Sequence, residues 1–239
     1  MARFDTTHWS VVLRARGNED DARQALETLC RTYRPPVLAY VRMRGYAPEA
    51  AEDLAQTFFT RFLERAYHAN ADPARGRFRA FLLTALKRFL IDADAEATAL
   101  KRGGDFRFRS LESAGINEDN TLNRISDGDS PERAFERSWA VALLNSAMRK
   151  LRDEAASAGK AQLFERLSEF LTDRPDEADY ELAANELNLR RNTLAVAVHR
   201  LRHRLRELVR EELAETTLDA AEMRSELREL RGALGEMMG

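Results

Sequence analysis

Residues 180–210 read YELAANELNLRRNTLAVAVHRLRHRLRELVR, and this stretch decides how the second half of the chain folds. Its later part repeats apolar residues in steps of four and three, which is one stripe of an α-helix: Leu194, Val198, Leu201, Leu205 and Leu208. Its earlier part has a shorter apolar side made of Leu182, Ala183, Leu187 and Leu189. Asn188 lies at the junction, and asparagine is, after glycine, the residue that best tolerates a left-handed backbone. The pattern therefore predicts two helices joined by a tight turn.

The second of these helices is basic on the side away from the apolar stripe. Between Arg190 and Arg206 there are six arginines, two histidines and no acid, although the whole chain has a net charge of −2. A local basic helix on a nearly neutral protein indicates binding to phosphate, and the second helix of a helix-turn-helix enters the major groove of DNA. At 100° per residue, the side opposite the stripe carries Asn192, Val196, His199 and His203.

These positions give a set of candidate DNA contacts. Arg191 and Asn192 are placed to reach base edges, whereas His199, Arg200 and Arg204 are placed to reach phosphates. The full candidate set in this helix is Arg190, Arg191, Asn192, Thr193, His199, Arg200, His203 and Arg204. The alternative is an ordinary amphipathic helix with a solvated basic face.

The same segment resembles the promoter −35 reading region of bacterial extracytoplasmic-function (ECF) sigma factors. That region often ends in a T-V…H-R-A-R run, which here is Thr193, Leu194, His199, Arg200, Leu201 and Arg202. Two alanines, Ala195 and Ala197, stand where the family often has Lys and Arg. The resemblance implies that base readout near the middle of this helix is weaker or different from the family's usual pattern.

The organisation of the chain is similar to the sigma-factor plan over nearly its whole length. We expect an all-α protein with two small helical domains joined by a flexible linker, the second domain containing the helix-turn-helix. Residues 1–102 form the first block, and 103–130 form a linker rich in Gly, Ser, Asn and Asp with a net negative charge. Residues 131–213 form the second block, which opens on a proline suited to a helix start, and 214–239 form a helical extension. We expect this extension to fold back on the second domain; a regulatory or partner contact is the alternative.

A strongly apolar helix is predicted after residue 77, with Phe78, Phe81, Leu82, Ala85, Leu86, Phe89 and Leu90 on its core side. The resemblance implies that this neighbourhood contacts and melts the −10 element. Bases taken out of a duplex need a basic surface along the strand, so basic residues here are candidate contacts. The candidate contacts are Arg79, Lys87, Arg88, Lys101 and Arg102. A core helix with surface arginines is the alternative, and the acids Asp92, Asp94 and Glu96 depart from the family pattern.

The segment PEAAEDLAQTFFTRFLER, residues 48–65, predicts a helix with one apolar and one acidic face. On a helical wheel the second face collects Glu49, Glu52, Asp53, Gln56, Thr57 and Thr60. By resemblance, Glu49, Glu52, Asp53 and Gln56 bind the clamp helices of the largest subunit of core RNA polymerase. The family usually reads D-L-x-Q-E here, and this chain has Thr57 in place of the last acid.

That substitution suggests a switch. Phosphorylation of Thr57 by a Ser/Thr protein kinase would add about −1.5 to −2 charge where the face lacks an acid. The alternative is that Thr57 is a tolerated surface residue and the remaining acids suffice. The sequence says nothing about an anti-sigma factor.

Other functions find little support in the sequence. There is no phosphate-binding Gly loop, nucleophile elbow or cysteine pair with metal spacing, so we expect no catalytic residue, no cofactor and no enzyme activity. His199 and His203 are four apart but sit among arginines that would repel a cation, so we expect no metal site. We find neither a signal peptide nor a run of 18–20 apolar residues, so we expect a cytoplasmic protein that does not enter a membrane. A conventional helix-turn-helix regulator that is not a polymerase subunit, and a helical scaffold with an incidental basic helix, remain alternatives.

Overall fold

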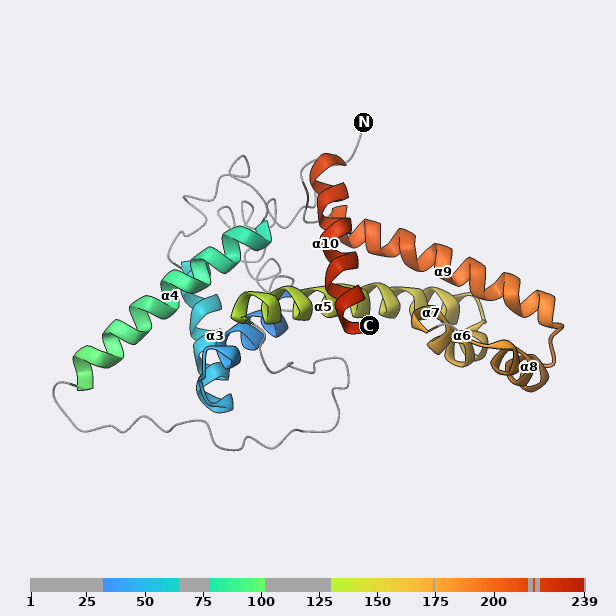
Figure 1. Ribbon diagram of the computed structural model, residues 1–239, viewed down its shortest axis with the longest axis horizontal. Coiled ribbons are helices and arrows are strands. Elements are labelled where there is room, and N and C mark those ends of the chain that lie inside the picture. The colour runs from blue at the N-terminus through green and yellow to red at the C-terminus, as the bar shows by residue number, and fades with distance from the viewer. Residues whose placement is uncertain are drawn as a thin grey trace. The chain divides into compact units, whose positions relative to one another are not determined.

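The computed structural model describes residues 32–64, 78–101, 130–173, 175–214, 217 and 220–238 (Figure 1). Within these ranges every regular element is a helix, as the all-α prediction requires. Residues 32–43 are helical, and the elements that follow are α3 Pro48–Glu64, α4 Phe78–Lys101, α5 Pro131–Ser157, α6 Ala161–Leu167, α7 Glu169–Thr172, α8 Glu177–Glu186, α9 Arg191–Ala214 and α10 Ala220–Met238. Nearly all of the predicted linker lies outside the described residues.

The chain divides into two compact units. Unit 1 comprises residues 1–142 and 214–239, and unit 2 comprises residues 143–213. The division falls inside α5, although the sequence suggested a boundary before Pro131. Unit 1 also includes α10, together with residues 131–142 of the block that the sequence assigned to the second domain.

Aromatic side chains form the centre of unit 1. Phe58 and Phe62 of α3 and Phe78 and Phe89 of α4 are all at most 3% exposed. Ring centroids lie 5.6 Å apart for Phe58 and Phe89 and 5.3 Å apart for Tyr33 and Phe78, and both pairs are tilted. Such tilted pairs contribute beyond their buried area, so the apolar faces predicted for α3 and α4 meet as a single core.

A buried charge joins three helices of unit 1. Arg79 of α4 is 5% exposed, and its guanidinium lies 4.0 Å from the ring centroid of Trp139 in α5. The same guanidinium forms ion pairs with Glu136 of α5 and with Glu226 and Glu229 of α10. A buried cation requires such partners, because desolvation without them is costly. These contacts connect α10 to α4 and α5 within unit 1.

In unit 2 the short helices α6, α7 and α8 pack against the first part of α9 (Figure 1). Their shared core consists of Leu167, Phe170, Ala183, Ala184, Leu194 and Val198. The stripe predicted for α9 is confirmed: Leu194, Val198, Leu205 and Leu208 are at most 7% exposed. The helical stretch between residues 161 and 172 is divided at Ser168 into α6 and α7.

Candidate nucleic-acid interface and acidic helix face

The turn between α8 and α9 adopts the backbone that the sequence indicated. Asn188 has φ of 50°, in the left-handed region that residues with a Cβ rarely enter. α8 begins with a capping box in which the Asp176 side chain accepts from the Asp179 backbone and the Asp179 side chain accepts from the Asp176 backbone. The capping box therefore fixes the start of α8. The left-handed Asn188 follows its end and sets the direction in which the chain enters α9.

The first turns of α9 present polar residues to solvent. Arg190, which directly precedes the helix, and Arg191, Asn192 and Thr193 at its start are all exposed. Arg191 forms an ion pair of 2.6 Å with Glu177 of α8, so its guanidinium is held near the turn. His199, Arg200 and His203 are also exposed, further along the helix. These seven residues of the predicted set therefore share an accessible surface.

Two arginines of α9 have structural partners instead. Arg202 donates to the carbonyl oxygens of Phe170 at 2.5 Å and of Asp173 at 2.9 Å, and so ties α7 to α9. Arg204, a predicted phosphate contact, forms ion pairs with Glu154 of α5 at 2.6 Å and with Glu207 and Glu211 of its own helix. These hydrogen bonds raise the pKa of Arg204 above its usual value and lower that of Glu154. Arg204 is therefore engaged by three carboxylates within unit 2, although its side chain is still 35% exposed.

The remaining cations differ in their surroundings. Among the residues that the structure describes, Arg190 and Arg200 form no ion pair. The Nδ1 atom of His203 lies 3.5 Å from Glu207, a contact that becomes an ion pair only when the imidazole is protonated. The positive charge available to a ligand thus includes Arg190, next to Arg191 at the start of α9, and Arg200 and the exposed Arg206 further along the helix.

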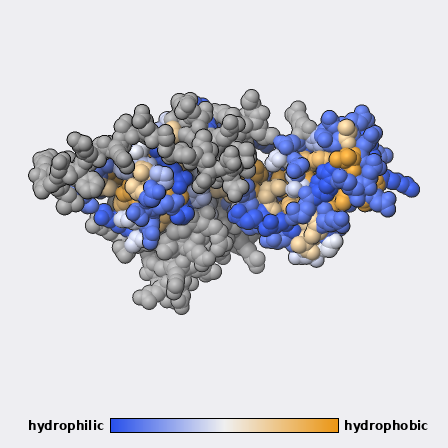
Figure 2. Space-filling model, turned by 90° about the horizontal axis from the view of Figure 1, so that it is seen from below, coloured by the Kyte–Doolittle hydropathy of each residue, from blue (hydrophilic) through white to orange (hydrophobic). Residues whose placement is uncertain are grey.

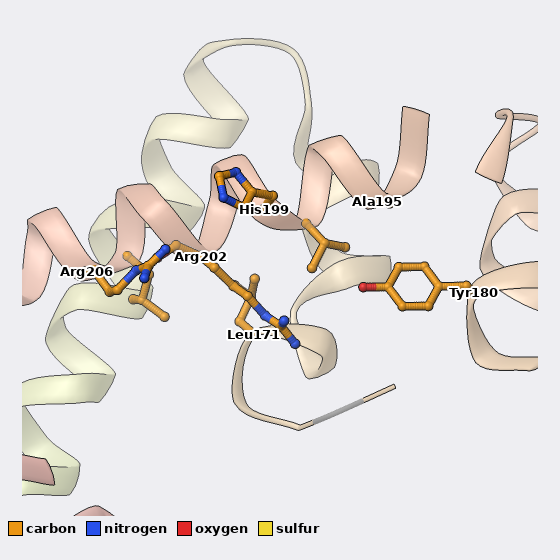
Figure 3. A pocket seen from close by; sticks show the side chains of 8 residues that line it. Leu171, Tyr180, Ala195, His199, Arg202 and Arg206 are labelled. Atoms are coloured by element: carbon orange, nitrogen blue, oxygen red, sulfur yellow. The ribbon is translucent and has the colours of Figure 1, made fainter. Parts of the chain in front are cut away.

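A pocket of about 560 Å³ lies along the same helix in unit 2. It is lined by Leu171, Tyr180, Ala195, Val198, His199, Arg202, Leu205 and Arg206. Figure 3 shows Tyr180 reaching in from α8, while His199, Arg202 and Arg206 come from α9. Tyr180 forms a tilted ring pair with Phe170 at 5.4 Å between ring centroids, and Arg206 donates to the Arg202 carbonyl at 3.1 Å. The pocket walls are therefore held by contacts within unit 2.

In unit 1, α3 exposes the acidic face that the sequence predicted. Glu49, Asp53, Gln56 and Thr57 are exposed, while its opposite side buries Ala51, Ala55, Phe58, Phe59 and Phe62. Glu52 is partly engaged, since it pairs with Arg34 and, at 3.2 Å, with Arg42. Among the described residues Glu49 and Asp53 form no ion pair, so their charges are available to a basic partner.

The basic residues predicted in α4 have three different environments. Arg79 is buried in the Trp139 cluster and is not a surface residue in this conformation, contrary to a role in DNA contact. Lys87 pairs at 2.7 Å with Glu132 of α5, and this hydrogen bond raises the pKa of Lys87 and lowers that of Glu132. Arg88 is exposed; Lys101 is the last residue of α4, and Arg102 lies outside the described residues.

The acids near the end of α4 have partners that the sequence did not suggest. Asp94 accepts a hydrogen bond from Tyr46 and lies 3.9 Å from Arg44, and Glu96 lies 3.5 Å from Arg61 of α3. Burial, followed by the hydrogen bond to Asp94, raises the pKa of Tyr46 to about 12. These departures from the family pattern therefore link α4 to α3 and to the turn before it.

The space-filling view gives the surface character of one face. Where described residues are visible, hydrophilic atoms dominate and smaller hydrophobic areas appear between them (Figure 2). None of the described helices combines the length and apolarity that crossing a membrane would require. The described side chains also include no group of three His, Cys, Asp or Glu able to hold a metal ion.

Residues 29–97, which include α3 and most of α4, match the protein-family model of Sigma-70 region 2. Region 2 is the part of sigma factors that binds core RNA polymerase, so the match supports a sigma-70 family sigma factor that acts in promoter-specific transcription. Neither a curated protein nor a solved structure was found to match the chain.

Proposed function

We propose that this chain is an alternative sigma factor of the ECF kind, which binds core RNA polymerase through α3 and reads promoter DNA through α8 and α9. The observation that carries the proposal is the region 2 match over residues 29–97, within which α3 exposes Glu49, Asp53 and Gln56. Its action is equilibrium recognition of polymerase and DNA, without catalysis and without a cofactor.

The α3 face fits a basic helical partner. Its apolar side is buried in the core of unit 1, so the acidic side is the one accessible to a partner. The clamp helices of the polymerase largest subunit are the proposed partner. Charge pairs of this kind set orientation and the rate of association more than they set affinity, and rim charges make binding sensitive to salt.

We further propose that phosphorylation of Thr57 completes this face. Thr57 is exposed and lies one turn after Asp53 on the same side of α3, so a kinase has access to its hydroxyl. A phosphate there adds about −1.5 to −2 charge and three acceptor oxygens. The arginines of a clamp helix would then meet a continuous acidic stripe from Glu49 to residue 57.

We assign promoter −35 reading to α8 and α9 as a helix-turn-helix. The left-handed Asn188, the buried stripe of α9 and the exposed polar start of that helix support this assignment. Arg190 and Arg200 are proposed phosphate contacts, since both are exposed and neither forms an ion pair with a described residue.

The test is binding of the purified full chain to bacterial core polymerase. Wild type, Thr57→Ala, Thr57→Glu and kinase-treated protein are compared, with Thr60→Ala as the matched control because Thr60 is exposed one turn further along α3. We expect kinase treatment to tighten binding of wild type and Thr60→Ala, and to leave Thr57→Ala unchanged.

Three outcomes separate the hypotheses. Tight binding by all forms keeps the sigma assignment and removes the phosphorylation switch. Specific binding to a duplex without any affinity for core polymerase favours the conventional regulator. Absence of binding to both polymerase and DNA refutes the proposed function.

A further inference from the structure

An exposed apolar side chain stands in the middle of the polar face of α9. Among the residues that the structure describes, the large hydrophobic side chains left exposed are Ile91, Leu182 and Val196, and Val196 is 49% exposed. Val196 lies on the side opposite the buried Leu194 and Val198. Its isopropyl group is therefore not part of the core of unit 2.

The neighbours of Val196 make it project from the helix surface. Asn192 precedes it by one turn and Arg200 follows it by one turn, so the three lie in a row along the exposed face. The adjacent residues Ala195 and Ala197 carry only a methyl group. A ligand that lies along this face meets an amide, an apolar group and a cation in succession.

We propose that Val196 reads the C5-methyl group of a thymine in the major groove. This inference rests on the proposed function of α9 and assigns to it a specificity residue. Thymine is distinguished in the major groove by its methyl group, which apolar side chains contact, while asparagine pairs with the adenine edge. The order of Asn192 and Val196 therefore suits an A/T-containing step in the recognised site.

The surroundings favour DNA over a protein partner. A protein-binding patch requires a contiguous apolar area, whereas Val196 is flanked by Asn192, His199 and Arg200. From Arg190 to Arg206 the helix carries no acid, and Arg190 and Arg200 form no ion pair with described residues. An apolar Val196 side chain on a helix that carries arginines is complementary to a thymine methyl group in a groove bordered by phosphates.

The test begins with selection of duplexes from a random library by the full chain, alone and bound to core polymerase. Each thymine in the enriched site is then replaced by uracil, which lacks the methyl group but keeps the hydrogen-bonding edge. Affinities are measured for wild type and Val196→Ala. Leu182→Ala is the matched control, since Leu182 is an exposed apolar residue of α8 in the same unit.

We expect uracil at one or two positions to weaken wild-type and Leu182→Ala binding about fourfold, the cost of losing one buried methyl group. Val196→Ala should show no further loss at those positions, because its contact is already absent. Equal uracil penalties in wild type and Val196→Ala, or no penalty in either, would overturn the inference while leaving DNA binding intact. Failure to enrich any duplex, with or without polymerase, would refute the proposed function itself.

Discussion

Replacement of Arg79 by methionine should strongly destabilise unit 1. Methionine keeps much of the apolar length of the side chain but removes the charge from a position that is 5% exposed. Glu226, 4% exposed at its side chain, then loses a partner whose Nη2 atom lies 3.0 Å from its Oε2 atom. This contact is an ion pair without the alignment of a hydrogen bond, so its contribution to the free energy of unfolding is mainly electrostatic.

The size of the effect follows from burial. Breaking a buried ion pair by removing one partner costs about 3–5 kcal/mol, because the other charge stays desolvated. Glu136 and Glu229 are 38% and 45% exposed, so solvent screens their pairs with Arg79 and they add little. Loss of the cation–π contact between the Arg79 guanidinium and Trp139 costs about 1–2 kcal/mol. This cost does not simply add to that of the broken ion pair, because both contacts involve the same guanidinium.

The assay is urea unfolding followed by tryptophan fluorescence and by circular dichroism. The chain has two tryptophans, so Trp9→Phe leaves Trp139, which contacts Arg79, as the reporter. Arg88→Met is the control, since Arg88 is exposed on the same helix and should change stability by less than about 0.5 kcal/mol.

A second substitution distinguishes the buried charge from simple loss of packing. Arg79→Met combined with Glu226→Met removes both charges and should recover most of the lost stability, as apolar replacement of buried ion pairs often does. A loss below about 1 kcal/mol in Arg79→Met, or a double variant no more stable than the single one, would refute the reasoning.

Three further predictions concern unit 2. Asn188→Gly should leave stability unchanged or slightly raised, whereas Asn188→Ala should cost about 1 kcal/mol because φ there is 50°, and urea unfolding measures both. The Arg204 hydrogen bond holds the pKa of Glu154 below 4.5, so Glu154 stabilises the fold above its unfolded pKa and stops doing so as pH falls through its folded pKa. Glu154→Gln should therefore lower stability at neutral pH by less than about 1 kcal/mol, and urea titrations should show the difference from wild type shrinking as pH falls through the folded pKa of Glu154. Arg200→Ala should weaken binding to all duplexes and reduce the slope of log affinity against log salt by about 1, as measured by fluorescence anisotropy. Arg204→Ala should leave that slope unchanged, because its guanidinium is already paired with Glu154, Glu207 and Glu211.

Local patterns in the sequence predicted the helices well. The stripe of α9 was read correctly because a period of 3.6 residues is a property of neighbouring positions, and so was the division of α3 into an apolar and an acidic face. Asn188 was likewise recognisable at the turn, since tolerance of positive φ belongs to the residue type itself. The residues exposed on α3 and at the start of α9 were therefore predictable from the sequence.

The partners that charged side chains find on other helices were not predictable in this way. Arg79 and Arg204 both looked like surface cations, but Arg79 meets carboxylates from α5 and α10, and Arg204 meets Glu154 of α5. These partners are 50 or more positions away in the chain, and no periodicity connects them. A helix pattern tells which side of a helix is apolar but not which helix will cover it.

The sequence by itself determined the helical class, most of the buried faces and the exposed polar faces of α3 and α9, although Leu182 of α8, predicted on an apolar side, is exposed. Only the tertiary structure decided which cations remain available for binding and that α10 belongs with the first unit. The physical reason is that the fate of a charge depends on which carboxylates packing brings within a few ångströms of it. That proximity is a property of the assembled helices and not of any one of them.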